Sequence, residues 1–181
     1  MELYPPKSFY TNRLIMEACR IEDAQDLFSN YTSSQEASKY LQRKPHDNIK
    51  KTENFIKNWG ADNWDNCSGN YAWSMKKKKS GEAFGVFILI VKSNEAEIHF
   101  GMQATMSGQG LATEAGLTII EWLKNEASIK KISTVCDIEH KSSQNVLSKI
   151  GLKKTKLLEK TLLLPAKGNQ YRDAWLYEWS K

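Results

Sequence analysis

The segment MQATMSGQGLATEA, residues 102–115, decides the fold because it joins a strand pattern to a helix pattern through two glycines. Before it, apolar and polar side chains alternate over residues 96–100, which is the period of a half-buried strand. After it, apolar residues recur every three or four positions, as on one face of a helix: Leu111, Ala115, Ile119 and Trp122. The sequence therefore predicts a strand, a glycine loop and a helix in succession.

The glycine loop predicts an anion-binding site. A helix N-terminus leaves several backbone N–H groups unpaired, and they point in one direction. Gly108 and Gly110 have no Cβ, so the backbone can approach a ligand closely there. No Lys-Ser/Thr pair follows them as in a P-loop, and the third glycine of the dinucleotide fingerprint is missing. A pyrophosphate fits such a loop best, and a plain turn before a helix start is the alternative.

The composition is that of an ordinary globular chain with one domain, residues 1–181. Hydrophobic residues make up 40% and charged residues 26%. The net charge of +5 favours an acidic, phosphate-bearing ligand, but does not by itself argue for nucleic acid. There is no apolar run near twenty residues and no signal-peptide pattern, so we expect no membrane partner. Cys19, Cys67 and Cys136 have no metal-ligand spacing, so we expect no metal and a cytoplasmic location.

The same periodicities predict the rest of a mixed α/β (α+β) fold. Strand patterns lie at residues 13–18, 71–75, 83–91, 97–102, 131–137, 157–165 and 171–179. Helix patterns lie at residues 23–28, 35–41, 48–60, from 111 onward and at 142–152 with a glycine stop, and a loop is expected at 60–70. The strand at 131–137 must return parallel to the strand before the glycine loop, because a helix crossover joins the two. We expect a largely antiparallel central sheet of about seven strands, with helices on both faces.

Three segments of the chain resemble one protein family. Residues 107–112 resemble the Gln/Arg-x-x-Gly-x-Gly/Ala signature of the GNAT superfamily of N-acetyltransferases, with Ser107 in place of Gln or Arg. More closely, residues 108–115 (GQGLATEA) resemble the Gly-Lys-Gly-Tyr-Ala-Thr-Glu-Ala of its ribosomal-protein-alanine acetyltransferase branch. Residues 11–14 (TNRL) are similar to the opening of the same branch. A further motif of the superfamily matches residues 143–151, with His140 in place of its Asn.

The resemblance implies a GNAT-like sheet that is splayed where acetyl-CoA binds, and acetyl-CoA as the cosubstrate without a metal. It implies that Met102 pairs with the pantetheine arm as an extra strand would. The implied pyrophosphate cradle consists of backbone amides from Ser107, Gly108, Gln109, Gly110, Leu111 and Ala112. His140 and Ser143, at the start of the following helix, are the remaining implied cofactor residues.

Acetyl transfer from a thioester to an amine needs a base, an oxyanion donor and a proton for the departing thiolate. Glu97 and His99 lie on one face of the predicted strand and are the candidate bases; the resemblance favours Glu97. Alternatively, Glu97 faces solvent and His99 packs in a polar corner. The backbone N–H near Met102 is the implied oxyanion donor, as in the superfamily's bulged strand.

The usual acid of the superfamily, a tyrosine, is replaced here by Leu147. Ser143 is the remaining hydroxyl, and a serine at the matching place is thought to serve as the acid in this branch. Its alternative role is that of a helix-start serine that satisfies a backbone N–H.

The acceptor is expected to be a primary amine, most simply a protein or peptide N-terminus. A polyamine, an amino acid or an aminoglycoside is the alternative, as is a non-catalytic acyl-CoA-binding module. Carboxylates between residues 35 and 70 are spread out among lysines, which favours a peptide over a polycation: Glu36, Asp47, Glu53, Asp62 and Asp65. The helices predicted within residues 35–60 would roof the acceptor site. A monomer or homodimer is expected.

Overall fold

The computed structural model describes residues 3–66 and 69–181, and in them a central sheet holds eight strands in the order β1-β2-β3-β4-β5-β6-β8-β7. The strands are β1 (Ser8–Tyr10), β2 (Leu14–Ala18), β3 (Asn70–Lys77), β4 (Ala83–Lys92), β5 (Glu95–Met102), β6 (Lys131–Asp137), β7 (Lys153–Leu164) and β8 (Gln170–Ser180). Neighbouring strands are antiparallel except for the parallel pair β5 and β6. The predicted mixed, largely antiparallel sheet is confirmed, with β1 as an additional edge strand.

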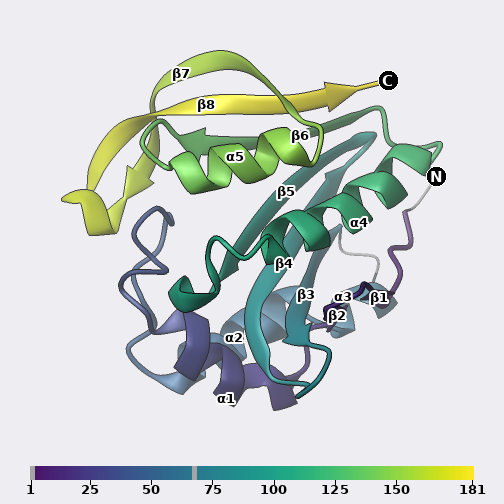
Figure 1. Ribbon diagram of the computed structural model, residues 1–181, viewed down its shortest axis with the longest axis vertical. Coiled ribbons are helices and arrows are strands. Elements are labelled where there is room, and N and C mark those ends of the chain that lie inside the picture. Colours follow the sequence, from purple (N-terminus) through teal and green to yellow (C-terminus); the bar gives the residue numbers. More distant parts are fainter. Residues whose placement is uncertain (1–2, 67–68) are drawn as a thin grey trace.

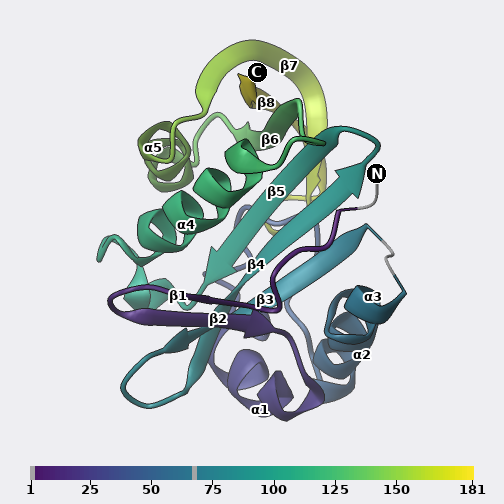
Figure 2. The ribbon, with the colours of Figure 1, turned by 90° about the vertical axis from the view of Figure 1, so that its right-hand side faces the viewer.

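Helices cover both faces of this sheet, as predicted (Figure 2). They are α1 (Ala24–Leu27), α2 (Ile49–Trp59), α3 (Asp62–Asp65), α4 (Leu111–Asn125) and α5 (Lys141–Lys149). Leu27 of α1 and Ile56 of α2 pack on one face, whereas Ile119 of α4 packs on the other against Ile98. No helix in the described ranges is long and apolar enough to cross a membrane.

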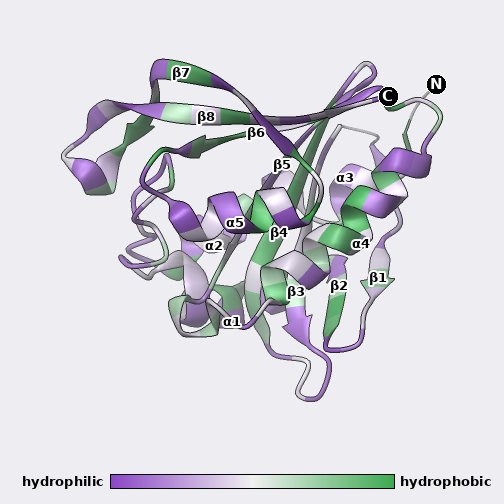
Figure 3. Ribbon diagram, turned by 45° about the horizontal axis from the view of Figure 1, so that its top comes forward, coloured by the Kyte–Doolittle hydropathy of each residue, from purple (hydrophilic) through white to green (hydrophobic). Residues whose placement is uncertain are grey.

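The strand β4 runs through the middle of the sheet and is buried along most of its length. It is coloured as hydrophobic over much of that length in Figure 3. An apolar strand with both faces covered is what its unbroken run of apolar side chains predicts. β4 therefore anchors β5, which carries the candidate bases.

The sheet opens between β5 and β6 (Figure 1). Their parallel pairing covers only three residue pairs and ends at Glu97 and Ser133. Beyond that point β5 pairs only with β4, as far as Met102, and β6 pairs only with β8, as far as Asp137. The splay implied by the resemblance is therefore present. The β4–β5 pairing shows no register shift, so the bulge that the resemblance implied at Met102 is not seen in this pairing.

Two predicted segments differ from the structure. Residues 35–41 were expected to be helical, but they form successive turns, and the Ser34 hydroxyl accepts the N–H of Ala37. Such side-chain bonds compete with a helix. The predicted loop at 60–70 contains the one-turn helix α3, because Trp64 is buried and donates its indole N–H to the carbonyl of Pro5. Cys67 and Ser68, within the same predicted loop, lie outside the described residues.

Candidate active site

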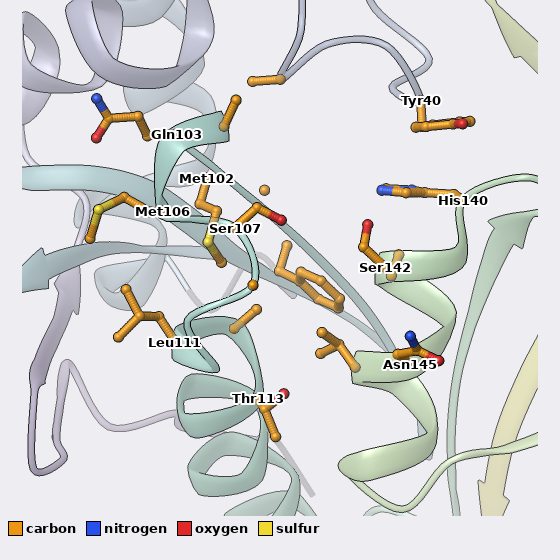
Figure 4. Close-up of a pocket in the computed structure, with 18 of the residues that line it drawn as sticks. Tyr40, Met102, Gln103, Met106, Ser107, Leu111, Thr113, His140, Ser142 and Asn145 are labelled. Atoms are coloured by element: carbon orange, nitrogen blue, oxygen red, sulfur yellow. The ribbon is translucent and has the colours of Figure 1, made fainter.

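A cavity of about 400 Å³ lies where the opened sheet meets the glycine loop. Its walls come from the end of β5, the loop and first turn of α4, the first turns of α5 and the turn segment 36–41. Figure 4 shows side chains from all four regions converging on it. Elements distant in the sequence thus meet at the place where an anion site was predicted.

The glycine loop has the geometry that an anion site needs. Gly108 and Gly110 have φ angles of 79° and 77°, a region that side chains with a Cβ rarely adopt. Gly110 is the N-cap of α4, and no side chain caps the helix there. The first intrahelical bond runs from the N–H of Glu114 to the carbonyl of Gly110. The N–H groups of the preceding helical residues are thereby left for a ligand, which fits a pyrophosphate.

All of the predicted cofactor residues line this cavity except Gln109. The side chain of Gln109 turns back to donate to the carbonyl of Thr105, at 3.1 Å, and the backbone carbonyl of Gln109 accepts from Arg13. Several polar residues that were not selected from the sequence also line the cavity, among them Thr113, Ser142 and Asn145 (Figure 4). Ser142 and Asn145 are three residues apart on one helix, so they lie on the same face. This spacing is the feature of the sequence that could have identified them.

A smaller cavity of about 100 Å³ lies in the opening between β5 and β6. Its walls include His99 and Phe100 from β5 and Thr134 and Cys136 from β6. Its lining shares Tyr40, Leu41, Phe100, His140 and Ser143 with that of the main cavity. His99 therefore lies in the opening itself, whereas Glu97 is not among the residues that line either cavity.

Glu97 and His99 form a hydrogen-bonded pair on one face of β5. The distance from His99 Nε2 to Glu97 Oε1 is 2.8 Å, and both side chains are partly exposed. The bond to His99 lowers the pKa of Glu97, although partial burial opposes the change. Glu97 is therefore a carboxylate at neutral pH and accepts a hydrogen bond from the Nε2–H of His99. A neutral His99 then carries its free lone pair on Nδ1, as a base must.

Ser143 lies on α5 beside the thiol of Cys136. Burial raises the pKa of Cys136 to about 11, although a hydrogen bond with Ser143 opposes the change. Cys136 is therefore a neutral thiol rather than a nucleophilic thiolate at physiological pH. Leu147 is buried in the wall of the smaller cavity, which puts no hydroxyl at the place of the superfamily's tyrosine.

Tyr40 and His140 stack face to face in the wall of the main cavity, with ring centroids 4.1 Å apart and planes 11° apart (Figure 4). Tyr40 also packs against the small apolar cluster of Leu162, Leu164 and Ala174 in the β7–β8 hairpin. Burial lowers the pKa of His140 to about 4, so the ring is neutral. The stack thus joins the turn segment 36–41 to the hairpin and to the start of α5.

Comparisons with known proteins agree with this geometry. Residues 13–153 match the profile of the acetyltransferase (GNAT) domain. An uncharacterized N-acetyltransferase, p20, of Bacillus licheniformis is 24% identical over 155 residues, which cover 84% of this chain and 85% of that protein. No group of three metal-ligating side chains that could hold a metal ion occurs in the part of the chain that the structure describes.

Two solved structures have the same fold. The microcin C7 self-immunity acetyltransferase MccE, in complex with acetyl-CoA and AMP, superposes with a TM-score of 0.85, 19% identity and 98% coverage of both chains. The ribosomal-protein-S5-alanine acetyltransferase of Vibrio fischeri superposes with a TM-score of 0.81, 13% identity and 96% coverage of both chains. Because the matched domain spans most of its length, this chain belongs to the GNAT acetyltransferase family and is an N-acetyltransferase.

Proposed function

We propose that this enzyme transfers an acetyl group from acetyl-CoA directly to a primary amine, most simply the N-terminal amine of a peptide or protein. The observation that carries the proposal is that the uncapped start of α4 lines one cavity, His99 lines an adjoining one, and the two cavities have five lining residues in common. The first would hold a pyrophosphate, and the second would admit an amine to the thioester.

The donor would be held mainly by backbone groups. Amides from Ser107 to Ala112 would contact the pyrophosphate, and the unpaired edge of β5 near Met102 would pair with the pantetheine amides. Acetyl-CoA supplies an acetyl thioester, whose C–S bond breaks as the amine nitrogen forms an amide. The amine must therefore lose a proton and the departing sulfur must gain one.

The Glu97–His99 pair would remove the proton from the amine. A protonated amine has no lone pair to attack with, so the base must accept a proton before or during attack. His99 lines the opening and has Nδ1 free to accept it, while Glu97 fixes the ring and the tautomer through Nε2. The resemblance favours Glu97 as the base, whereas the position of His99 in the cavity wall favours His99.

The Ser143 hydroxyl would return a proton to the sulfur. It is the hydroxyl of α5 that lines both cavities, and it lies in the first turn of the helix. The backbone N–H near Met102 would stabilise the developing negative charge on the thioester oxygen.

The acceptor is inferred from the charges around the main cavity. Glu36, Lys39 and Lys149 are the charged residues among those that line it, so a polyamine would meet one carboxylate rather than a cluster. Structures with this fold are named for a protein acceptor, S5-alanine, and for spermidine, so the inference of a peptide amine depends on the charges of the cavity. A small amine is the second candidate.

A thiol-release screen tests the proposed function. The full chain would be incubated with acetyl-CoA and either peptides with varied first residues or a panel of amines, including spermidine, amino acids and aminoglycosides. We expect release with peptides that begin with a small residue. Thiol release with small amines alone would show that the acceptor is a small amine and not a peptide. Binding of acetyl-CoA without thiol release with any acceptor would favour the non-catalytic module.

A further inference from the structure

Two of the sequence motifs, residues 11–14 and 108–115, meet in space although about a hundred residues separate them. The carboxylate of Glu114, on the first turn of α4, accepts hydrogen bonds from the backbone N–H of Arg13, at 2.9 Å, and from Arg13 Nε, at 2.7 Å. The hydroxyl of Thr11 donates to the same carboxylate. We call Thr11, Arg13 and Glu114 the loop clamp.

The loop clamp reaches the glycine loop through the second arm of the guanidinium. Arg13 Nη1 donates to the carbonyl oxygen of Gln109 at 2.9 Å. In a planar trans peptide the C=O and the next N–H point in opposite directions. Holding the Gln109 oxygen toward Arg13 therefore turns the N–H of Gly110 away from Arg13. Gly110 lines the main cavity and Gln109 does not, so this orientation aims the N–H at the cavity side.

The loop clamp also neutralises a charge that would otherwise oppose an anion. Glu114 lies in the first turn of α4, beside the proposed pyrophosphate cradle. Burial raises the pKa of Glu114, but the bonds from Thr11 and Arg13 lower it by more, so the group stays ionised. Its two oxygens are occupied by Thr11 and Arg13, and the pair carries no net charge.

From these contacts we propose that Arg13 and Glu114 are positioning residues for the donor, holding the Gln109–Gly110 peptide with its N–H toward the pyrophosphate. The inference rests on the proposed use of acetyl-CoA. It extends the donor site to a residue directly before β2, outside the cavity lining. Arg13 acts through the loop and not on the reacting atoms.

The test compares two donors in an Arg13→Gln variant. Acetyl-CoA carries the pyrophosphate, whereas S-acetylpantetheine has the same thioester and arm without it. We expect KM for acetyl-CoA to rise roughly tenfold, the worth of one charge-assisted hydrogen bond, with kcat and the acceptor KM unchanged. The kcat/KM for S-acetylpantetheine should stay at the wild-type value, which also shows that the variant is folded.

Two further variants distinguish the effect of breaking the loop clamp from the effect of losing any surface ion pair. Lys131→Gln breaks a comparable pair with Glu178, which likewise accepts from a threonine, Thr155, and should leave both donors unaffected. Adding Glu114→Gln to Arg13→Gln removes the unpaired carboxylate and should recover part of the acetyl-CoA affinity.

Wild-type KM for acetyl-CoA in Arg13→Gln, or equal losses with both donors, would overturn the role of the loop clamp. The Gly108→Val variant distinguishes that failure from failure of the proposed function. If Gly108→Val loses acetyl-CoA binding while Arg13→Gln does not, only the loop clamp is wrong. If neither variant loses binding, the assignment of the donor site is wrong, and so is the proposed role of the loop clamp.

Discussion

His99 combines two properties at the level of a single residue: it lines the opening between β5 and β6, and a carboxylate holds its ring. Replacing it by Gln keeps the size and polarity but removes the base. We expect kcat of His99→Gln to fall by roughly 10²–10⁴-fold, the usual contribution of a general base. Acetyl-CoA affinity, measured by calorimetry, should stay constant because the glycine loop is untouched.

Glu97→Gln should have the smaller effect, since His99 remains and loses only its fixed tautomer. The opposite order, with Glu97→Gln severely impaired and His99→Gln near wild type, would assign the proton transfer to Glu97. In that case His99 would be the positioning residue of the pair.

The sequence anticipated residues whose roles depend on local geometry. Strand alternation put Glu97 and His99 on one face, and two glycines close together indicated the positive φ angles of the loop. It did not anticipate that Arg13 reaches Gln109, because such a bond depends on how β2 packs beside α4. Nor did it single out Tyr40, whose importance comes from contacts with His140 and the distant hairpin.

Among the elements, the turn segment 36–41 is the part of the cavity wall that we propose contacts the acceptor. Tyr40→Ala would remove the stack on His140 and the contact with the hairpin, and so loosen this wall. We expect the KM for the acceptor to rise while the calorimetric affinity for acetyl-CoA is retained. Tyr171→Ala is the matched control, because Tyr171 is 63% exposed on β8 and does not line the cavity.

An unchanged acceptor KM in Tyr40→Ala, or a change that Tyr171→Ala reproduces, would remove the turn segment from acceptor recognition. Specificity would then have to lie elsewhere in the cavity wall.

Long periodic elements were predictable, and short ones were not. α2 and α4 have eleven and fifteen residues with clear apolar faces, so pattern alone identifies them. β1 and α3 have three and four residues, too few for a period to show. Residues 35–41 have a helical pattern of apolar side chains, but Tyr40 uses its apolar surface on the hairpin rather than on a helix face.

For the whole molecule, the topology brings the proposed anion site and the proposed amine entrance together. The helix crossover from β5 to β6 was predictable from the sequence and places the start of α4 beside the opening. The position of β8 between β6 and β7 was not predictable, because sequence patterns do not specify which strand a hairpin joins.

Stability should depend on pH through the partly buried His140. Its pKa is lowered to about 4 from an ordinary value of 6.5, so between these values the unfolded chain binds a proton that the folded chain does not. The stabilising contribution is present above pH 6.5 and is lost as the pH falls toward 4. His46, whose pKa burial also lowers to about 4, contributes with the same sign.

Melting temperatures measured across this range should fall with pH in the wild type and fall less steeply in a His140→Gln variant. An equal slope in the two proteins would show that His140 is not held neutral by burial.

The central claim is that acetyl-CoA binds through the backbone of the glycine loop, and calorimetry of two matched glycine variants tests it most directly. Gly108 and Gly168 have φ angles of 79° and 78°, and a Cβ at either would meet nothing within 4 Å, but only Gly108 lines the cavity. Changing either to Val should lower stability by a similar amount, about 1–2 kcal/mol for a side chain in this region. We predict that Gly108→Val loses acetyl-CoA binding and that Gly168→Val keeps it; equal affinity in the two variants would contradict the account.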